Sequence, residues 1–176
     1  MIKNKYVSLS DKWKHWKSVI DLVRCLNCEK MHGKIYGIDE VVISPEEQMH
    51  HRCRCKIVRM QAILAGNATK KGVDGADWYL KYYGILPDYY ISYEDAKKAG
   101  WNPKVGNLHL KCPNKMITNG IFRNENKHLP LRPGRIWYEA DINYERGRRN
   151  TERIVYSNDG LIFVTYDHYH TFVEIK

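Results

Sequence analysis

Four side chains in the last forty or so residues have the chemistry needed to cleave RNA. Glu139 lies in a run of alternating residues, Arg149 and Arg153 follow it, and His168 lies near the end of the chain. RNA carries its own nucleophile, the 2′-hydroxyl. Cleavage therefore needs a base for that proton, an acid for the departing 5′-oxygen, and cations for the charge on phosphate. A carboxylate, an imidazole and two guanidinium groups can fill these roles without a metal ion.

Each of these side chains suits one role. Glu139 is the candidate base. His168 is the candidate acid, because a reference pKa near 6.5 lets imidazole hold a proton at mild pH. His170 is the alternative acid. Arg149 and Arg153 are candidates for the phosphate, since a guanidinium group offers paired donors to two oxygens.

The alternation over residues 136–144 predicts that a strand positions Glu139. Side chains alternate across a strand, so Ala140 belongs to an apolar face that can pack against a helix. Glu139 and Asp141 belong to the opposite face, where we expect them to line a cleft with Arg135 nearby. The alternative is an ordinary solvated sheet face.

A change of composition near residue 66 predicts two regions. Residues 1–66 hold four of the five cysteines, and residues 67–72 are small and polar, as in a linker. We predict a helix from Ser10 to Cys25, with Ser10 as its N-cap. The apolar residues at helical spacing are Trp13, Trp16, Ile20 and Val23.

The second region, residues 73–176, is predicted to begin with helices and to continue with strands. A helix from Asp74 to Tyr83 precedes another that opens at Ser92, where Asp95 completes a capping box. Helices followed by antiparallel strands indicate an α+β fold with a five-stranded sheet. The strand candidates are Met116–Phe122, Ile136–Tyr144, Glu152–Ser157, Leu161–Tyr166 and Thr171–Ile175.

The overall charge favours a polyanionic partner. The chain has 176 residues, a formal net charge of +9 and 43% hydrophobic residues, so it is globular and basic. RNA or DNA is then favoured over a membrane as partner, and a merely soluble basic protein is the alternative. We expect no membrane span, because no apolar run approaches about 18 residues. The first twenty residues lack the core of a signal peptide.

The cysteines of the first region are spaced as in zinc-binding proteins. A C-x-x-C pair is followed by a distant cluster of cysteine and histidine, which suits tetrahedral zinc. Disulfides and free thiols are the alternatives, and Cys112 lies apart. His50 is a further possible ligand, but the predicted ligand set is Cys25, Cys28, Cys53, Cys55 and His51.

From about Val73 to Lys176 the chain resembles the barnase-like family of microbial, guanyl-preferring ribonucleases. The matching segments follow one another without large gaps. They are Ala76-Asp77, Leu86-Pro87-Asp88, Gly100-Trp101, Gly106-Asn107-Leu108, Ile121-Phe122, Leu129-Pro130, Glu139 to Tyr144, Arg149-Asn150, Tyr156-Ser157 and Asp167-His168-Tyr169.

This resemblance implies three helices and five strands, with the cleft on the sheet. It implies Glu139 as general base and His168 as general acid, and Arg149 and Arg153 at the scissile phosphate. Asp141 would be a buried partner of the arginines. The expected activity is metal-independent cleavage of single-stranded RNA by 2′-OH transphosphorylation, leaving 2′,3′-cyclic phosphate and 5′-hydroxyl ends.

The chain departs from the family at two places in the cleft. Tyr93 stands where the family has a lysine, and Asn126 stands where it has a base-reading glutamate, so base preference stays open. The predicted substrate-binding residues are Phe122, Asn124, Glu125, Asn126, Tyr169, Tyr93 and Arg135.

The cysteine segment resembles the tail of phage head-morphogenesis proteins, and such segments can precede toxin modules. We therefore expect a delivered or secreted toxin that acts in the target-cell cytoplasm, with an acidic, barstar-like inhibitor as partner. The competing hypothesis is a non-catalytic RNA-binding or phage assembly protein with a degenerate ribonuclease fold. A metal-dependent nuclease is disfavoured, since no carboxylate and histidine set suggests an open metal site.

Overall fold

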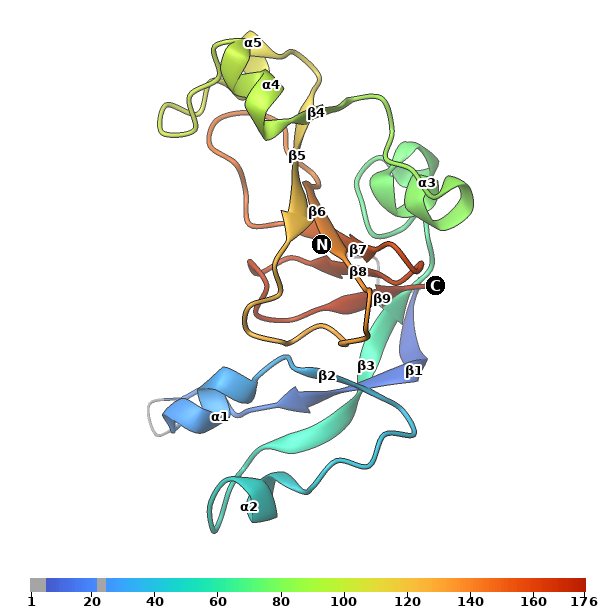
Figure 1. Ribbon diagram of the computed structural model, residues 1–176, viewed down its shortest axis with the longest axis vertical. Coiled ribbons are helices and arrows are strands. Elements are labelled where there is room, and N and C mark those ends of the chain that lie inside the picture. The colour runs from blue at the N-terminus through green and yellow to red at the C-terminus, as the bar shows by residue number, and fades with distance from the viewer. Residues whose placement is uncertain (1–5, 22–24) are drawn as a thin grey trace.

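The computed structural model describes residues 6–21 and 25–176, and one large mixed sheet forms its centre (Figure 1). The described strands lie in the order β2-β1-β3-β9-β8-β7-β6-β5-β4. Their bounds are β1 Val7–Lys17, β2 Ile35–Gly37, β3 Lys56–Ile63, β4 Tyr90–Ser92, β5 Met116–Phe122, β6 Trp137–Asp141, β7 Arg153–Ser157, β8 Ile162–Thr165 and β9 Val173–Ile175. The α-helices are α1 Leu26–Met31, α2 Pro45–Gln48, α3 Ala76–Tyr83, α4 Tyr93–Lys98 and α5 Leu108–Lys111.

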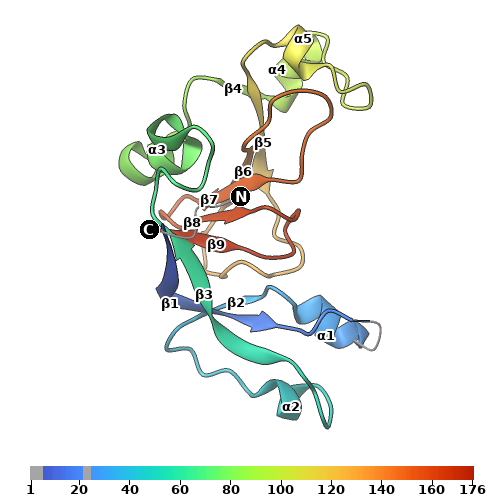
Figure 2. The ribbon, with the colours of Figure 1, turned by 180° about the vertical axis from the view of Figure 1, so that it is seen from behind.

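The predicted α+β class and the five predicted strands are confirmed, as β5 to β9. A sheet of only five antiparallel strands is wrong, because nine described strands share one sheet. Two of its pairings, β3 with β9 and β4 with β5, are parallel. The edge of β9 would otherwise present unpaired backbone groups, and β3 covers it. Figure 2 shows β3 and β9 meeting near the C-terminus.

The predicted helix from Ser10 to Cys25 is wrong, because β1 occupies the first half of that segment, as far as Lys17; residues 22–24 of the prediction lie outside the described residues. Ser10 does accept backbone hydrogen bonds, from Lys12 at 3.1 Å and Trp13 at 2.9 Å. It does so where the register of β1 with β3 shifts between Leu9 and Lys14. A bulge breaks strict alternation, so the apolar spacing resembled that of a helix.

The helices of the second region agree with their sequence signals. Helix α3 ends at Gly84 in a left-handed conformation, with φ of +71°. Ser92 caps α4 by accepting from the backbone of Asp95 at 3.0 Å, and its hydroxyl donates to the Asp95 carboxylate at 2.8 Å. With α5, the region has the three α-helices that the family resemblance implied.

Strand β6 is held from both faces. On one face Ala140 and Ile142 pack with Ala76 and Leu80 of α3, as the alternation predicted. On the other face Trp137 is buried in a second cluster that includes Val155, Phe163, Leu129 and Phe172. This packing fixes the tilt of β6, and with it the directions of Glu139 and Asp141.

The predicted linker, residues 67–72, is bound to α3. The carboxylate of Asp77, which is fully buried, accepts from the backbone of Gly66 at 2.8 Å and of Ala68 at 2.9 Å, and from the hydroxyl of Thr69 at 2.9 Å. The division into residues 1–66, 67–72 and 73–176 stays a prediction, although one sheet spans both regions.

Candidate active site

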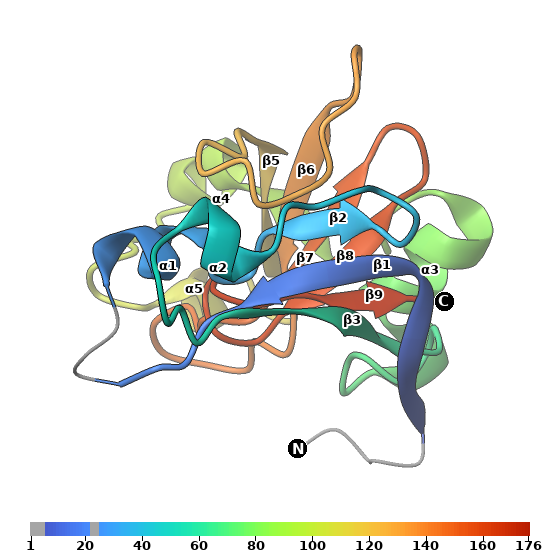
Figure 3. The same ribbon diagram turned by 90° about the horizontal axis from the view of Figure 1, so that it is seen from below.

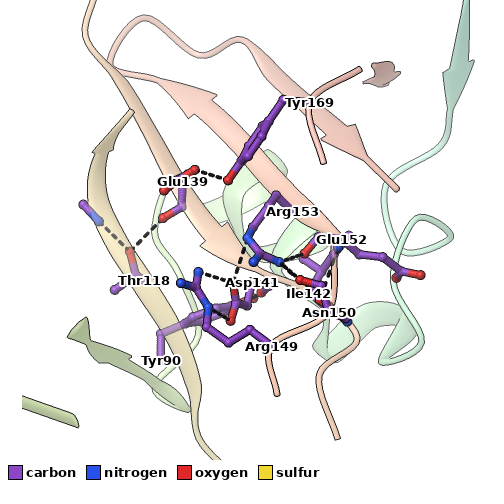
Figure 4. A network of polar contacts seen from close by, with 11 residues as sticks. Tyr90, Thr118, Glu139, Asp141, Ile142, Arg149, Asn150, Glu152, Arg153 and Tyr169 are labelled. Carbon is purple, nitrogen blue, oxygen red and sulfur yellow. Dashed lines mark hydrogen bonds and ion pairs between the residues drawn. The ribbon is translucent and has the colours of Figure 1, made fainter. Parts of the chain in front are cut away.

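A buried carboxylate joins the two arginines that we predicted for the phosphate (Figure 4). Asp141 on β6 lies opposite Arg153 on β7 and is 0% exposed. Arg149 donates to it through Nε at 2.7 Å and Nη2 at 2.6 Å, and the Nε of Arg153 lies 3.0 Å from its Oδ1. Asp141 therefore orients the guanidinium groups, in agreement with the family resemblance. It is buried among them and does not line an open cleft as the strand pattern suggested.

The two arginines differ in how far they can reach a ligand. The side chain of Arg153 is 5% exposed, and its Nη1 donates to the carbonyl groups of Asn150 at 2.8 Å and Glu152 at 2.7 Å. The side chain of Arg149 is 19% exposed. Burial lowers the pKa of Arg149, but the hydrogen bonds to Asp141 outweigh this and hold it above the usual value. Arg149 is thus the more accessible cation.

Glu139 is two residues before Asp141 on β6, so its side chain leaves the same face of the sheet. Its carboxylate accepts a hydrogen bond from the Tyr169 hydroxyl (Figure 4). Burial, and then this bond, raise the pKa of Tyr169 well above its usual value, so the phenol stays a donor. The backbone carbonyl of Glu139 accepts from Thr118 of β5 at 3.0 Å. Glu139 is therefore held from two neighbouring segments.

The turn between β8 and β9 presents His168 beside Tyr169. Both have left-handed backbones, with φ of +56° and +70°, and their ring centroids are 4.8 Å apart. Asp167 stabilises this strained turn, because its carboxylate accepts from Thr171 N at 2.9 Å and from Thr171 Oγ1 at 2.6 Å. Burial raises the pKa of Asp167, but the bonds from Thr171 lower it overall. His168 itself is exposed.

The predicted base-reading loop follows β5. Phe122 stacks on Tyr169 with centroids 5.0 Å apart, which joins this loop to the turn that carries His168. Asn124 is buried, and its amide exchanges two hydrogen bonds with the backbone of Leu129 at 3.0 and 3.1 Å, so its side chain closes the loop. Glu125 and Asn126 are exposed. Their side chains are thus the accessible polar groups of the predicted base-reading set.

Two further residues that we predicted to bind substrate, Arg135 and Tyr93, instead contact other side chains of the protein. The guanidinium of Arg135 binds the Asp159 carboxylate, with Nη2 at 2.7 Å from Oδ2, and lies 5.8 Å from the centre of the Trp137 ring. Tyr93 packs edge-on against Trp101 with centroids 5.1 Å apart. We therefore expect both residues to support the walls of the cleft.

A groove of about 670 Å³ opens beside these elements. One wall is formed by Phe122 and the loop after it, and another by the turn that carries His168 and Tyr169. The third wall comes from the N-terminal region, through Glu29, Lys30 and His32. Sequence patterns did not indicate this third wall, nor the parts played by Asp167 and Thr118, because only tertiary packing brings these residues to the site.

The thiol groups of the N-terminal region also converge. The Sγ of Cys28 lies 3.5 Å from that of Cys53 and 3.5 Å from Nε2 of His50. Two overlapping sets could hold a metal ion, and Cys28 belongs to both; they are Cys25, Cys28 and His50, and Cys28, Cys53 and Cys55. All five cysteines are free thiols in this structure. The predicted ligand His51 is absent from both described sets, and its carbonyl instead lies 3.0 Å from the ring of His50.

Comparison with known proteins identifies the second region. A family model described as ribonuclease matches residues 77–176, more than half of the chain. This chain belongs to the ribonuclease family. It is 48% identical over 103 residues to a ribonuclease of Heyndrickxia coagulans, covering 58% of this chain and 94% of that protein. Ribonucleases of Bacillus intermedius and Bacillus pumilus match at the same identity and length, and the match spans 64% of each.

The family assignment makes the chain an endoribonuclease, and RNA is the substrate consistent with it. This outcome agrees with the enzyme hypothesis and not with the non-catalytic alternative. Residues 1–76 lie outside the family match. Among the described residues, no helix is both long and apolar enough to cross a bilayer.

Proposed function

We propose that this ribonuclease cleaves single-stranded RNA by transphosphorylation, with Glu139 as base and His168 as acid. Glu139 takes the proton of the 2′-hydroxyl, and the 2′-oxygen attacks phosphorus. The bond to the 5′-oxygen breaks, and His168 protonates that oxygen as it leaves. The products are a 2′,3′-cyclic phosphate and a 5′-hydroxyl. Arg149 and, behind it, Arg153 stabilise the charge that develops on the phosphate.

The observation that carries this proposal is the position of Tyr169. Its hydroxyl donates to Glu139, while its ring lies 4.8 Å from the ring of His168. One aromatic side chain thus contacts both the acidic and the imidazole group. A phosphodiester beside Tyr169 would have a base and an acid near the same ring. Arg149 is held by Asp141, two residues after Glu139 on β6.

The nature of the RNA ends tests this chemistry directly. We expect 2′,3′-cyclic phosphate and 5′-hydroxyl ends, identified by mass spectrometry, with and without chelator. An otherwise identical oligonucleotide with 2′-deoxyribose at the scissile position should bind and stay intact. Cleavage of the deoxy substrate, or 5′-phosphate ends, would show that another nucleophile is used.

Replacing Tyr169 by phenylalanine isolates the hydrogen bond to Glu139. The ring, and with it the stacking on Phe122, is kept, while the carboxylate loses one orienting donor. A hydrogen bond to a charged group is worth about 1.5–3 kcal/mol, and since bound RNA can supply another donor we expect a loss of about tenfold in kcat. Steady-state kinetics on a dinucleotide checks this. A loss confined to KM would assign the hydroxyl to substrate binding.

We further propose a structural zinc ion in the cysteine cluster, held by four of Cys25, Cys28, His50, Cys53 and Cys55. A tetrahedron with Zn–S bonds of about 2.3 Å places sulfur atoms about 3.8 Å apart, close to the 3.5 Å between Cys28 and Cys53. Zinc there would stabilise a region with little core of its own. No step of RNA cleavage involves it.

Chelation and a matched pair of variants test the zinc site. We expect about one zinc per purified chain, and a fall in Tm when it is removed, while cleavage of a dinucleotide continues. Cys28→Ser, which affects both candidate ligand sets, should lose the metal. Cys112→Ser, at a buried cysteine outside them, should keep it. Equal metal content in both variants would contradict the site.

Finally, we propose that the chain is a toxin module, delivered into the cytoplasm of a target cell and restrained by an acidic, barstar-like inhibitor. The support is the chain's basic charge and the resemblance of its cysteine segment to segments that precede toxins. Carboxylates of the inhibitor would lie against Arg149, Arg153 and His168. The association rate should fall steeply with added salt; a rate independent of salt would argue against such a partner.

A further inference from the structure

A second groove, of about 980 Å³, runs along the N-terminal strands. It lies over β1, β3 and the start of β9, which Figure 3 shows side by side. The described residues that line it include none that is acidic. Its basic and imidazole side chains are His15, Lys17, His32, Arg54, Lys56 and Arg59.

Two lysines lie side by side on neighbouring strands in this groove. Lys17 of β1 and Lys56 of β3 are register partners in the antiparallel pair, and both are exposed. Like charges directly opposite each other destabilise a sheet. A bound anion would remove that repulsion, because it interacts favourably with both ammonium groups. The pair therefore has the character of a binding site rather than of a stabilising contact.

Arg54, Arg59 and His15 line the same groove and show that its surface is positively charged. Arg54 and Arg59 form ion pairs at 2.6 Å with Asp21 and Asp11, which do not line the groove. Burial, and then the charges of His32 and Lys17, lower the pKa of His15 to about 4. Part of that shift is the electrostatic effect of a positive surface, and such a surface attracts phosphate.

This second groove, the basic groove, adjoins the groove lined by His168 and Tyr169, the active-site groove, because His32 lines both. The N-terminal region is fastened at this junction. His128 donates through Nε2 to the carbonyl of Lys30 at 2.8 Å, and its own carbonyl accepts from Ile35 at 2.8 Å. At Gly33, with φ of +84°, a Cβ would lie 2.1 Å from the carbonyl oxygen of His170, so only glycine permits this approach.

The His128 imidazole is itself buried at this attachment, with Nδ1 close to Gly33. His128 is 7% exposed and lines the active-site groove, and its Nδ1 has no hydrogen-bond partner among the described residues. Since Nε2 is the donor toward Lys30, Nδ1 is left as an acceptor.

We propose that the basic groove binds the part of the RNA strand that extends beyond the cleavage site. The strand leaves the active-site groove past His32, and its phosphates lie between Lys17 and Lys56. The N-terminal region, which lies outside the family match, thereby gives this ribonuclease a preference for long substrates. The proposal needs RNA as the substrate, but it does not depend on which residues are the acid and the base.

Charge reversal of the two lysines tests the proposal on substrates of different length. The logarithm of the affinity for single-stranded nucleic acid falls linearly with the logarithm of the salt concentration. The slope is about −0.7 for each phosphate contact. Lys17→Glu with Lys56→Glu should therefore weaken binding of a 20-nucleotide RNA about 25-fold at 0.1 M salt and reduce the slope by about 1.4. The probe for binding is 2′-O-methyl RNA, which has no free 2′-hydroxyl. Cleavage of a dinucleotide should change less than twofold.

The controls separate this effect from folding and from overall charge. Lys17→Glu alone places opposite charges in register, so its Tm should stay equal or rise while its binding of long RNA weakens. Lys81→Glu, an exposed charge reversal on α3 outside both grooves, should leave the length preference unchanged. Equal losses on the 20-mer and the dinucleotide, or no loss on either, would overturn the proposal. Long-RNA binding that is intact without any cleavage would instead count against the proposed chemistry.

Discussion

Replacing either Glu139 or His168 by alanine will reduce kcat for RNA cleavage by about 10²–10⁴-fold. Each variant removes one proton transfer from the reaction, because Glu139 would accept the proton of the 2′-hydroxyl and His168 would supply one to the 5′-oxygen. Binding of 2′-O-methyl RNA should change little, since the arginines and the groove remain. Single-turnover kinetics on a defined oligonucleotide measures the chemical step.

Matched variants make this result specific. Glu139→Gln keeps the size of the side chain and its ability to accept from Tyr169, but it cannot act as a base, so it should be as inactive as alanine. His170→Ala changes the exposed histidine two residues after His168 and should stay active. If His170→Ala is inactive and His168→Ala is not, the acid has been assigned to the wrong residue. Full activity of the Glu139 and His168 variants would exclude the proposed mechanism.

Replacing Asp141 by alanine will have the largest effect on stability. Its carboxylate is 0% exposed and binds both Arg149 and Arg153. Removing one partner of a buried ion pair leaves an uncompensated charge and costs about 3–5 kcal/mol. The free energy of unfolding, measured from urea titrations, should fall by that amount. The same variant should lose activity even where it is folded, because Arg149 loses the group that orients it.

An exposed ion pair provides the comparison. Asp11 pairs with Arg59 and Lys176, but its side chain is 79% exposed, and solvent screens the interaction. Asp11→Ala should therefore change the urea midpoint only slightly and leave dinucleotide cleavage intact. If Asp141→Ala proves no more harmful than Asp11→Ala, the arginines must have other partners that hold them in place.

The effects expected from changing Asp141 and from changing Glu139 are connected, because both residues lie on β6. Residues 139 and 141 leave the same face of one strand, which the packing of Ala140 against α3 holds in place. A variant that shifts β6 would therefore affect both the carboxylate base and the orientation of the arginines. Each alanine variant should therefore be compared with an isosteric variant at the same position.

Sequence patterns alone were sufficient to predict the secondary structure in the part of the chain where local and tertiary preferences agree. The strands β5 to β9 follow runs that the sequence marks as strands, and the signals at Ser92 and Gly84 are local hydrogen-bond and backbone requirements. The face that carries Glu139 follows from a period of two along β6. Local sequence was therefore enough to place Glu139 and Asp141 on one face, because side-chain alternation does not depend on what the strand packs against.

Tertiary structure alone decided the rest. Ser10 is an acceptor for nearby backbone groups in either a helix cap or a strand bulge, and only pairing with β3 selected the bulge. Sequence spacing could not choose between His50 and His51 as neighbours of the thiols. Nor could it bring Lys17 opposite Lys56, or His32 to the rim of the active site. These contacts join residues far apart in the chain, and their geometry depends on how strands from both regions pair in one sheet.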